Sequence, residues 1–419
     1  MDGKKCQLVR KRVYNLAKQK NSAIFDKIVI LCIVVKQRKR RRIMTTLRTI
    51  LSWIYTMVIY IRHRLYDWGI IKSRTFDIPI VCVGNITVGG TGKTPTVEYL
   101  LSILDGKYNI AVLSRGYGRR TKGYREVQVD DTYLDVGDEP LLLKLKFPER
   151  PIIVSEDRVA GIERIRKEHP EVTLIVMDDG FQHRKVKAKV NIILIDSTRP
   201  IDNDEMLPLG RLRDLPSRLS EAHIFIVTKC SDKMLPIDRR LWITKLRSIA
   251  YQRIYFTRYN SPMIEPVFYF EDREEVNYGM QAILVSGIGN PRPFIKEAER
   301  RFSVIEKMIF NDHHDFTVED LKRIYAVLKR NPRALIIMTE KDAVKLRRAK
   351  LPMALMRAMY YQPINMRFIE GPDSNFLGTL IKNIEYKENS ERPKVHPESE
   401  VVVEDESVVL EETEEHNDL

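Results

Sequence analysis

The stretch GNITVGGTGKTP at residues 84–95 follows directly on the apolar run IPIVCV at residues 78–83. The apolar run predicts a buried strand, and residues 94–104 predict a helix. A glycine-rich turn between a strand and a helix presents several backbone N–H groups and a helix N-terminus to a single anion. The stretch therefore predicts a loop that binds phosphate.

The residue types within this turn suit the phosphates of a nucleotide. Its glycines allow close approach, Lys93 can reach the terminal phosphates, and the hydroxyl of Thr94 is placed for Mg²⁺. The strict pattern requires a glycine at position 87, where this chain has threonine, so GGTGKT is closer to the variant loops written GGxGK[ST]. The residues expected to bind nucleotide are Thr87, Val88, Gly89, Gly90, Thr91, Gly92, Lys93 and Thr94.

Apolar strands and helices alternate after residue 74, which is typical of a mostly parallel sheet with helices on both faces. The expected strands are 78–83, 110–114, 151–154, 173–177, 190–195 and 224–228, and the expected helices include 94–104, 158–168 and 238–248. A second set predicts a smaller C-terminal α/β lobe from about residue 260, with strands at 282–286, 303–310, 334–338 and 366–369 and helices at 293–301 and 318–329. The fold class is α/β of the P-loop NTPase type.

Composition excludes several classes of protein. A chain of 419 residues with 43% hydrophobic content can bury one large core or two ordinary ones. Its four cysteines form no CxxC pair, and Cys82 lies within an apolar strand, so neither a disulfide framework nor a zinc site is indicated. A reducing, cytosolic setting is expected.

The net charge of +14 is distributed unevenly. Residues 1–43 carry 14 Lys or Arg against 2 Asp, and residues 385–419 carry 3 against 13 acidic residues. We expect a poorly ordered basic extension over 1–43 and a disordered acidic tail over 385–419. Between them lie a hydrophobic helix at 44–74, a P-loop core at 75–260 and the smaller lobe at 261–384.

The N-terminal region has a basic block, KQRKRRR at 36–42, and then a nearly continuous apolar stretch at 45–61. The block suits a nucleic-acid patch, a membrane-surface patch or upstream sequence that the mature protein does not use. The apolar stretch is short for a span, which needs about 20 residues, and indicates an interfacial or shallowly inserted helix. A packed soluble helix with aromatic core residues is the alternative.

Two carboxylates follow the predicted strand at residues 173–177. Asp178 and Asp179 end the strand TLIVM, where a Mg²⁺-organising acid is expected, although they could simply cap the turn. Gln182 and His183 add polar groups at the same edge, and His183 alone could equally face solvent.

The segment GDEPLLL places Asp138 and Glu139 in the first turn of a helix, where capping is the simplest interpretation. Only a partner would make Asp138 a base, and NDHHDF at 311–316 is the candidate segment, because a histidine beside a carboxylate can tune proton uptake.

These motifs together resemble a known family. GNITVGGTGKTP, LSRGYGR, GDEPLLL, MDDGFQH, LPLGRLRD and the DHH segment occur in this order, as in the tetraacyldisaccharide 4′-kinases, the lipid A 4′-kinases of Gram-negative bacteria. The resemblance runs from about residue 44 to about residue 370, and departure from the strict loop at Thr87 is a family trait.

The resemblance implies a P-loop kinase that uses ATP and Mg²⁺ to phosphorylate the 4′-hydroxyl of a tetraacylated glucosamine disaccharide 1-phosphate. It implies docking on the cytoplasmic face of the inner membrane through the N-terminal helix. Lys93 and Thr94 would hold phosphate and metal, Asp178 and Asp179 would organise Mg²⁺, Asp138 would be the base, and His313 would assist it. By the same resemblance, Arg158, Gln182, His183, Arg213 and Asp214 are candidate substrate contacts.

Other functions remain open on the sequence alone. A regulatory or assembly NTPase of the GGxGKT type would hydrolyse its nucleotide with water, and TKCSD at 228–232 resembles a guanine-reading turn. A nucleic-acid partner is not expected, because the basic block has no aromatic platform or recognition motif beside it. No protein partner is inferred.

Overall fold

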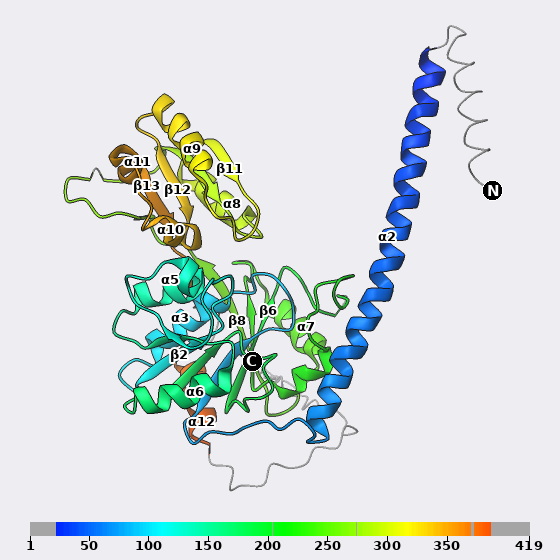
Figure 1. Ribbon diagram of the computed structural model, residues 1–419, viewed down its shortest axis with the longest axis vertical. Helices are drawn as coiled ribbons and strands as arrows, with labels where there is room; N and C mark the ends of the chain where they lie inside the picture. The colour runs from blue at the N-terminus through cyan, green and yellow to red at the C-terminus, as the bar shows by residue number, and fades with distance from the viewer. Residues whose placement is uncertain (1–21, 203, 274, 370–372, 387–419) are drawn as a thin grey trace, which may run out of the picture. The chain divides into compact units, whose positions relative to one another are not determined.

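The computed structural model describes residues 22–386 except 203, 274 and 370–372, and of 22–43, 373 and 374 it describes only the backbone. The acidic tail expected from residue 385 lies almost wholly outside these residues. Two sheets organise the described chain (Figure 1), one of nine strands and one of five.

The larger sheet has the order β14-β8-β7-β6-β1-β5-β2-β4-β3. Its strands are β1 (Ile80–Gly84), β2 (Ile110–Ser114), β3 (Arg125–Glu126), β4 (Ile152–Val154), β5 (Leu174–Asp178), β6 (Val190–Asp196), β7 (Ile224–Thr228), β8 (Arg253–Asn260) and β14 (Asn365–Phe368). All pairs are parallel except those of β3 and β14, which lie at the two edges. The strand β1 lies between β5 and β6, so the loop that follows it begins near the middle of the sheet.

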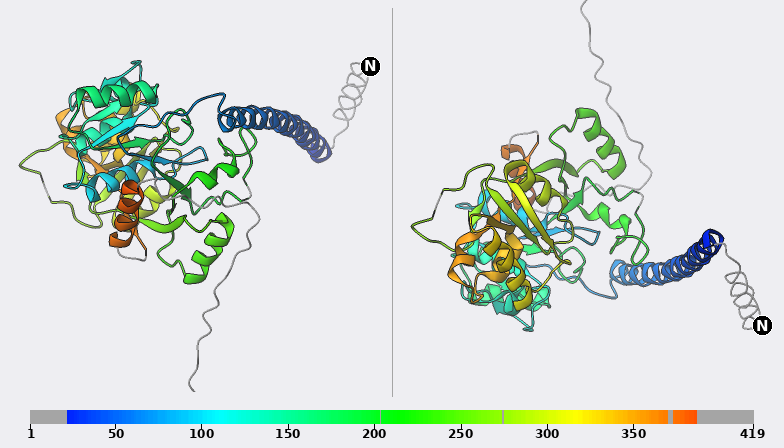
Figure 2. Two further views of the ribbon diagram at one scale, coloured as in Figure 1. Left: turned by 90° about the horizontal axis from the view of Figure 1, so that it is seen from below. Right: turned by 90° about the horizontal axis from the view of Figure 1, so that it is seen from above.

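Helices cover both faces of the larger sheet (Figure 1 and Figure 2), because successive strand residues point to opposite sides. Val81 and Val83 pack in one cluster, with helices α3, α5 and α12, whereas Ile80 and Cys82 pack in the other, with α6 and α7. These helices are α3 (Lys93–Ile103), α5 (Asp138–Lys146), α6 (Arg158–Glu168), α7 (Pro236–Leu246) and α12 (Asp373–Glu385), with the short α4 (Tyr133–Val136) and the 3₁₀ turn η1 (Pro216–Glu221) in connections. The predicted P-loop α/β class is confirmed.

The smaller sheet has the order β11-β10-β12-β13-β9 and is parallel except for β9. Its strands are β9 (Glu265–Pro266), β10 (Gln281–Ser286), β11 (Ser303–Ile309), β12 (Leu335–Thr339) and β13 (Met359–Gln362). The helices of this part are α8 (Arg292–Arg301), α9 (Val318–Arg330), α10 (Glu340–Leu346) and α11 (Met353–Ala358). The strands and helices predicted between residues 282 and 338 are all present.

One strand belongs to a different sheet from the one expected. The strand predicted at 366–369 for the smaller lobe is β14, which pairs antiparallel with β8 of the larger sheet. After it, Phe376, Leu380 and Ile384 of α12 pack into the larger core. The chain therefore returns to the larger sheet before residue 384, because an apolar pattern predicts a strand without identifying its neighbour.

The N-terminal helix is longer than predicted. The helix α2 (Ser22–Asp67) is continuous through the basic block, whereas residues up to 43 were expected to be poorly ordered. Its sequence contains no glycine or proline before Gly69, whose left-handed backbone follows the helix end. Met44–Asp67 is the one helix in the described chain that is long and apolar enough to cross a membrane by length and composition, and that is weak evidence by itself.

Candidate active site

The phosphate loop connects the buried strand β1 to helix α3. Gly92 at the start of α3 has a left-handed backbone with φ of 95°, and a Cβ atom there would lie 1.8 Å from the hydroxyl of Tyr259. Gly89 also has a positive φ. Inside the loop, the Asn85 side chain donates a 2.6 Å hydrogen bond to the Thr91 hydroxyl. Glycine is thus required at position 92 both by backbone angle and by space.

The loop is braced by the turn that was compared with a guanine-reading motif. Thr228 donates a 2.8 Å hydrogen bond from its hydroxyl to the Thr91 carbonyl. Lys229 donates to the Gly90 carbonyl and lies 2.6 Å from the Asp196 carboxylate. Thr228 and Lys229, the first two residues of TKCSD, therefore both hold the phosphate loop.

Asp178 and Asp179 stand beside this loop, since β5 is the neighbour of β1. Asp178 is buried and accepts a 3.3 Å hydrogen bond from Ser114, while its Oδ1 atom has no hydrogen-bond partner among the residues described. Burial, together with the charges of Glu139 and Asp179, raises the pKa of Asp178 to about 7 against the opposing charge of Lys93. An unpartnered buried carboxylate oxygen is costly unless a cation binds it.

Asp179 lies closer to the cations of the site. Its carboxylate is 3.7 Å from the Lys93 ammonium and accepts two hydrogen bonds from Arg213, one of them 3.0 Å long. Burial raises the pKa of Asp179, but the Lys93 charge and the Arg213 hydrogen bond outweigh it and hold that pKa below its ordinary value. Asp179 is therefore ionised at neutral pH.

Three of the candidate substrate contacts gather at the same edge. Arg158 is buried at the start of α6, and burial lowers its pKa to about 10 although the charge of Asp178 raises it. Gln182 donates a 2.6 Å hydrogen bond to the Asn85 carbonyl. His183 has a pKa lowered to about 4, chiefly by burial, and its Nε2 atom finds no partner within the described chain.

Asp214 lies apart from these groups. Its carboxylate is fully buried and accepts hydrogen bonds of 2.6 Å from His63 and 2.9 Å from Arg218. Arg213 beside it reaches the loop through Asp179 and Asn85. The two adjacent residues of RLRD thus have different surroundings, which their adjacency in the sequence does not indicate.

Asp138 and His313 are brought together across the two sheets. The Nδ1 atom of His313 lies 3.3 Å from a carboxylate oxygen of Asp138, at the N-terminus of α5. Burial raises the pKa of Asp138, but the His313 hydrogen bond and the Lys341 charge lower it to about 2. The hydrogen bond to Asp138 in turn raises the pKa of His313.

The next histidine has a local role. His314 lies 2.9 Å from Asp320 near the start of α9 and stacks on Phe310 with ring centroids 4.4 Å apart. Only the first histidine of the DHH segment therefore contacts Asp138.

Ion pairs join the helices that carry this contact. Glu139 of α5 accepts a hydrogen bond from Lys341 of α10, and Lys146 of α5 lies 2.6 Å from Glu340 of α10. The charge of Lys341 acts on Asp138, and that of Asp178 acts on Lys341. The charge of Lys341 therefore interacts both with Asp138 of the carboxylate–histidine pair and with Asp178 beside the phosphate loop.

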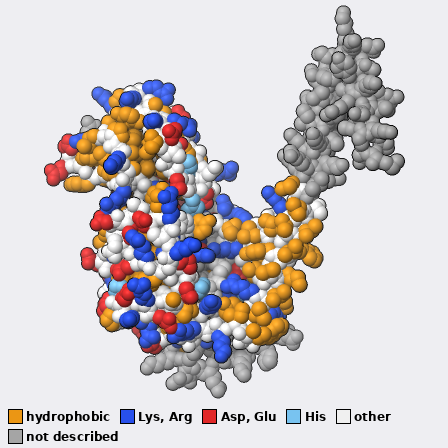
Figure 3. Space-filling model, in the orientation of Figure 1, with side chains coloured by type: hydrophobic (Ala, Val, Ile, Leu, Met, Phe, Trp, Pro, Cys, Tyr) orange, Lys and Arg blue, Asp and Glu red, His pale blue; other side chains and the backbone are white. Residues whose placement is uncertain are grey.

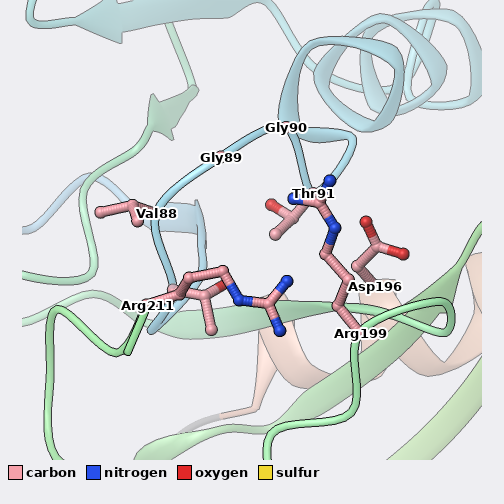
Figure 4. Close-up of a pocket in the computed structure, with 8 residues that line it drawn as sticks. Val88, Gly89, Gly90, Thr91, Asp196, Arg199 and Arg211 are labelled. Carbon is pink, nitrogen blue, oxygen red and sulfur yellow. The ribbon is translucent and has the colours of Figure 1, made fainter. Parts of the chain in front are cut away.

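Two arginines near the loop were not singled out in the sequence. Arg199 and Arg211 line a small pocket with Thr87, Gly89 and Asp196, and their guanidinium groups extend toward the loop (Figure 4). The Nη1 atom of Arg199 would lie 3.5 Å from a Cβ atom at Gly89. Arg199 follows the end of β6, the other neighbour of β1, so its place at the carboxyl edge of a parallel sheet was an available signal.

A phosphate loop after a central parallel strand, two aspartates at the end of the adjacent strand and a carboxylate–histidine pair define a P-loop protein equipped for phosphoryl transfer. A sequence model of the family LpxK, tetraacyldisaccharide-1-P 4′-kinase, matches residues 44–384. The chain belongs to this family, and the resemblance found in its motifs is confirmed.

Similar proteins carry the same description. A tetraacyldisaccharide 4′-kinase of Phocaeicola vulgatus is 40% identical over 78% of this chain and 91% of its own length. One of Parabacteroides distasonis is 38% identical over 84% of this chain and 96% of its own length. A crystal structure of LpxK from Aquifex aeolicus in complex with ATP covers 81% of this chain and 99% of its own, with a TM-score of 0.63 and 24% identity. That structure supports the fold.

Proposed function

We propose that this protein transfers the γ-phosphoryl group of ATP to the 4′-hydroxyl of a tetraacylated glucosamine disaccharide 1-phosphate. The observation that carries the proposal is the Asp138–His313 contact at 3.3 Å, linked through Lys341 to the edge that holds the phosphate loop. Family membership supports the choice of acceptor.

The donor would bind in the loop from Thr87 to Thr94. Backbone N–H groups and the N-terminus of α3 would receive the phosphates, and the Lys93 ammonium would neutralise their terminal charge. Arg199 and Arg211 would add positive charge to the same pocket. Most of the catalysis would then be positioning and electrostatic stabilisation.

The residues present fit Mg²⁺. Asp178 offers a buried oxygen atom that has no other partner in the part of the chain described, Asp179 is ionised, and Thr94 contributes a buried hydroxyl. No group of three or more His, Cys, Asp or Glu side chains suited to a metal occurs among the described residues. This agrees with an ion that takes few protein ligands and completes its shell with phosphate oxygens and water. When bound, Mg²⁺ would neutralise charge on the phosphates.

Asp138 would orient the acceptor hydroxyl and take its proton. The hydroxyl oxygen forms a bond to the γ-phosphorus, the bond from that phosphorus to the bridging oxygen breaks, and ADP leaves with the electron pair. With a pKa of about 2, Asp138 is ionised at neutral pH but holds a proton weakly, so the transfer would come late, when the forming bond has made the hydroxyl acidic. His313 would hold the carboxylate in place.

The acceptor headgroup would lie against Arg158, Gln182 and His183. Arg158 offers a buried cation, and His183 is neutral at pH 7, so its unpartnered Nε2 atom could exchange a hydrogen bond with a sugar hydroxyl. These groups share the edge at which Asp178 stands.

The helix α2 would bring the enzyme to its lipid at the cytoplasmic face of the bacterial inner membrane. Hydrophobic side chains cover its outer face (Figure 3), with Trp53 77% exposed and Met57 64% exposed. Such a surface in water is unusual unless it meets a partner or a membrane. In a flotation assay with anionic vesicles, a protein beginning at Met44 is expected to float at low and high salt. If this protein stays in the soluble fraction at both salt concentrations, the anchor lies in the basic block instead.

The proposed activity is tested by supplying purified protein with ATP, Mg²⁺ and detergent-dispersed disaccharide 1-phosphate. We expect ADP and a bis-phosphorylated lipid in equal amounts. Nucleotide turnover that proceeds equally fast without lipid would instead support the regulatory NTPase.

A further inference from the structure

The helix α2 has a second face, which contacts the core. Ser52 is buried and donates a 2.8 Å hydrogen bond to the Met206 carbonyl, and Tyr55 donates one of 3.0 Å to the Arg213 carbonyl. His63, eleven residues after Ser52, is also buried. Residues at such helical spacing share one side of a helix. The side opposite the exposed apolar surface therefore packs on the core, and its polar groups bond the loop that carries RLRD.

The buried pair of His63 and Asp214 lies at the centre of this contact. The Nε2 atom of His63 is 2.6 Å from Asp214, which also accepts hydrogen bonds from Arg218 and from the Leu215 backbone. Arg218 continues to the Phe181 carbonyl at 2.8 Å. The Asp214 carboxylate thus joins α2 to its own segment and, through Arg218, to the segment of Phe181 that follows β5.

Residues 211–213 lie directly beside the phosphate loop. Val88 donates a backbone hydrogen bond of 2.8 Å to the Arg211 carbonyl, and Arg213 donates one of 2.8 Å to the Ile86 carbonyl. Thr87 and Leu212 form an antiparallel bridge between these bonds. The segment therefore acts as a short strand, with the phosphate loop bound to its backbone and α2 bound through Tyr55 and Asp214.

The side chain of Arg213 completes the connection. It bonds Asp179, which lies 3.7 Å from Lys93, and it reaches the carbonyl of Asn85, the residue whose side chain bonds Thr91. A shift of Arg213 would change the surroundings of Lys93 and of the loop backbone together. Small displacements of this kind have large effects on phosphoryl transfer, which depends on positioning.

We propose that His63 and Asp214 are positioning residues, which hold segment 211–213 against the phosphate loop and so couple the seating of α2 to nucleotide binding. The inference deepens the proposed function and rests on it for the role of the loop. Neither residue touches substrate in this scheme. Both act through Arg213.

The test measures binding of a fluorescent ATP analogue, with Mg²⁺ and without lipid, to the full chain in detergent micelles. Asp214→Asn leaves an amide N–H₂ facing a donor, either His63 or Arg218. We expect the Kd for the nucleotide to rise about five- to tenfold, together with the KM for ATP, while the KM for lipid changes less than twofold. His63→Leu should behave alike, and the double variant should be no worse than Asp214→Asn, because the two residues act as one unit.

Two comparisons separate positioning from simple loss of stability. His63→Gln keeps an N–H donor near the Nε2 position and should restore the nucleotide Kd to within about twofold of the unmodified protein, since it preserves the bond to Asp214. Leu246→Ala removes a buried side chain of the same core and should lower Tm without changing that Kd. An unchanged Kd in Asp214→Asn and His63→Leu, with Tm lowered as in Leu246→Ala, would overturn the proposal. Because binding is measured without lipid, absence of lipid phosphorylation would disprove the proposed function separately.

Discussion

The phosphate loop draws its neighbours from one sheet, whereas the Asp138–His313 pair joins elements built on two. Around the loop, Thr228, Lys229 and Asp196 come from the ends of adjacent parallel strands and are fixed by hydrogen bonds. The pair depends instead on contact between α5 and the smaller sheet's loop, where His313 is 44% exposed at its side chain. We therefore expect the proposed nucleotide site to be rigid and the proposed proton-accepting site to be adjustable.

The largest effect should come from the adjustable region. Asp138→Asn removes the proposed proton acceptor while keeping the shape of the side chain, so we expect kcat to fall about 10²-fold or more with the nucleotide Kd within about twofold. Lys93→Ala should show the opposite split, with weaker nucleotide binding. Steady-state kinetics combined with equilibrium binding would distinguish them.

The neighbouring histidines provide the matched control. His313→Gln should lower kcat about tenfold, whereas His314→Gln should change it less than threefold, because His314 contacts Asp320 and Phe310 rather than Asp138. Equal losses in the two variants would contradict a specific role for His313. A nearly normal kcat in Asp138→Asn would show that Asp138 is not the base and only caps the N-terminus of α5.

The rigid region is tested next by Gly92→Ala. A Cβ atom there would collide with the Tyr259 hydroxyl, so we expect nucleotide affinity to fall about tenfold or more as the loop shifts. Gly106→Ala is the control, because Gly106 also has a positive φ but has open space around it. If the two substitutions weaken nucleotide binding equally, backbone strain alone explains the effect and the loop is less constrained than its contacts indicate.

The same contrast explains what could be predicted from sequence. The phosphate loop and Asp178 could be placed together, because the carboxyl ends of neighbouring parallel strands meet at one edge. Asp138 and His313 could only be named as candidates, since no local pattern reports a contact between two sheets. Strand β14 was assigned to the wrong lobe for a related reason: its partner β8 is a half-buried strand whose charged residues conceal its pattern.

A smaller effect is expected from the ion pair between α5 and α10. Lys341→Met removes the bond to Glu139 and a charge near Asp138, so kcat should fall about three- to tenfold with little change in nucleotide Kd. Arg357→Met breaks an exposed pair with Asp272 inside the smaller lobe and should leave kcat unchanged. A kcat equal to that of the unmodified protein in Lys341→Met would show that this contact does not hold the pair together.

The smallest effect concerns pH. The folded-state pKa of Asp138 is lowered from 3.8 to about 2, so its contribution to stability is present above pH 3.8 and is lost as pH falls through about 2. The pKa of His313 is raised above 6.5 by the Asp138 hydrogen bond and by the charge of Asp312, against burial and Lys341. Its contribution is therefore complete below pH 6.5 and is lost as pH rises through the raised value. The Asp138–His313 pair therefore contributes most to stability between about pH 3.8 and pH 6.5.

We therefore expect the Tm of the unmodified protein to exceed that of His313→Gln at pH 6, and the difference to shrink by about pH 8.5. Taking the difference cancels groups that titrate in both proteins, Asp178 among them. In the Asp138→Asn background the same substitution should no longer produce a difference that shrinks as pH rises to the same extent, since only the charge of Asp312 is left to raise the histidine pKa against burial and Lys341. A difference that is constant from pH 6 to 8.5 in the unmodified background would mean that folding leaves the pKa of His313 unchanged, which would contradict the raised value. The charge of His313 would then add nothing to the contact with Asp138, and the adjustable region would owe its stability to Glu139 and Lys341 instead.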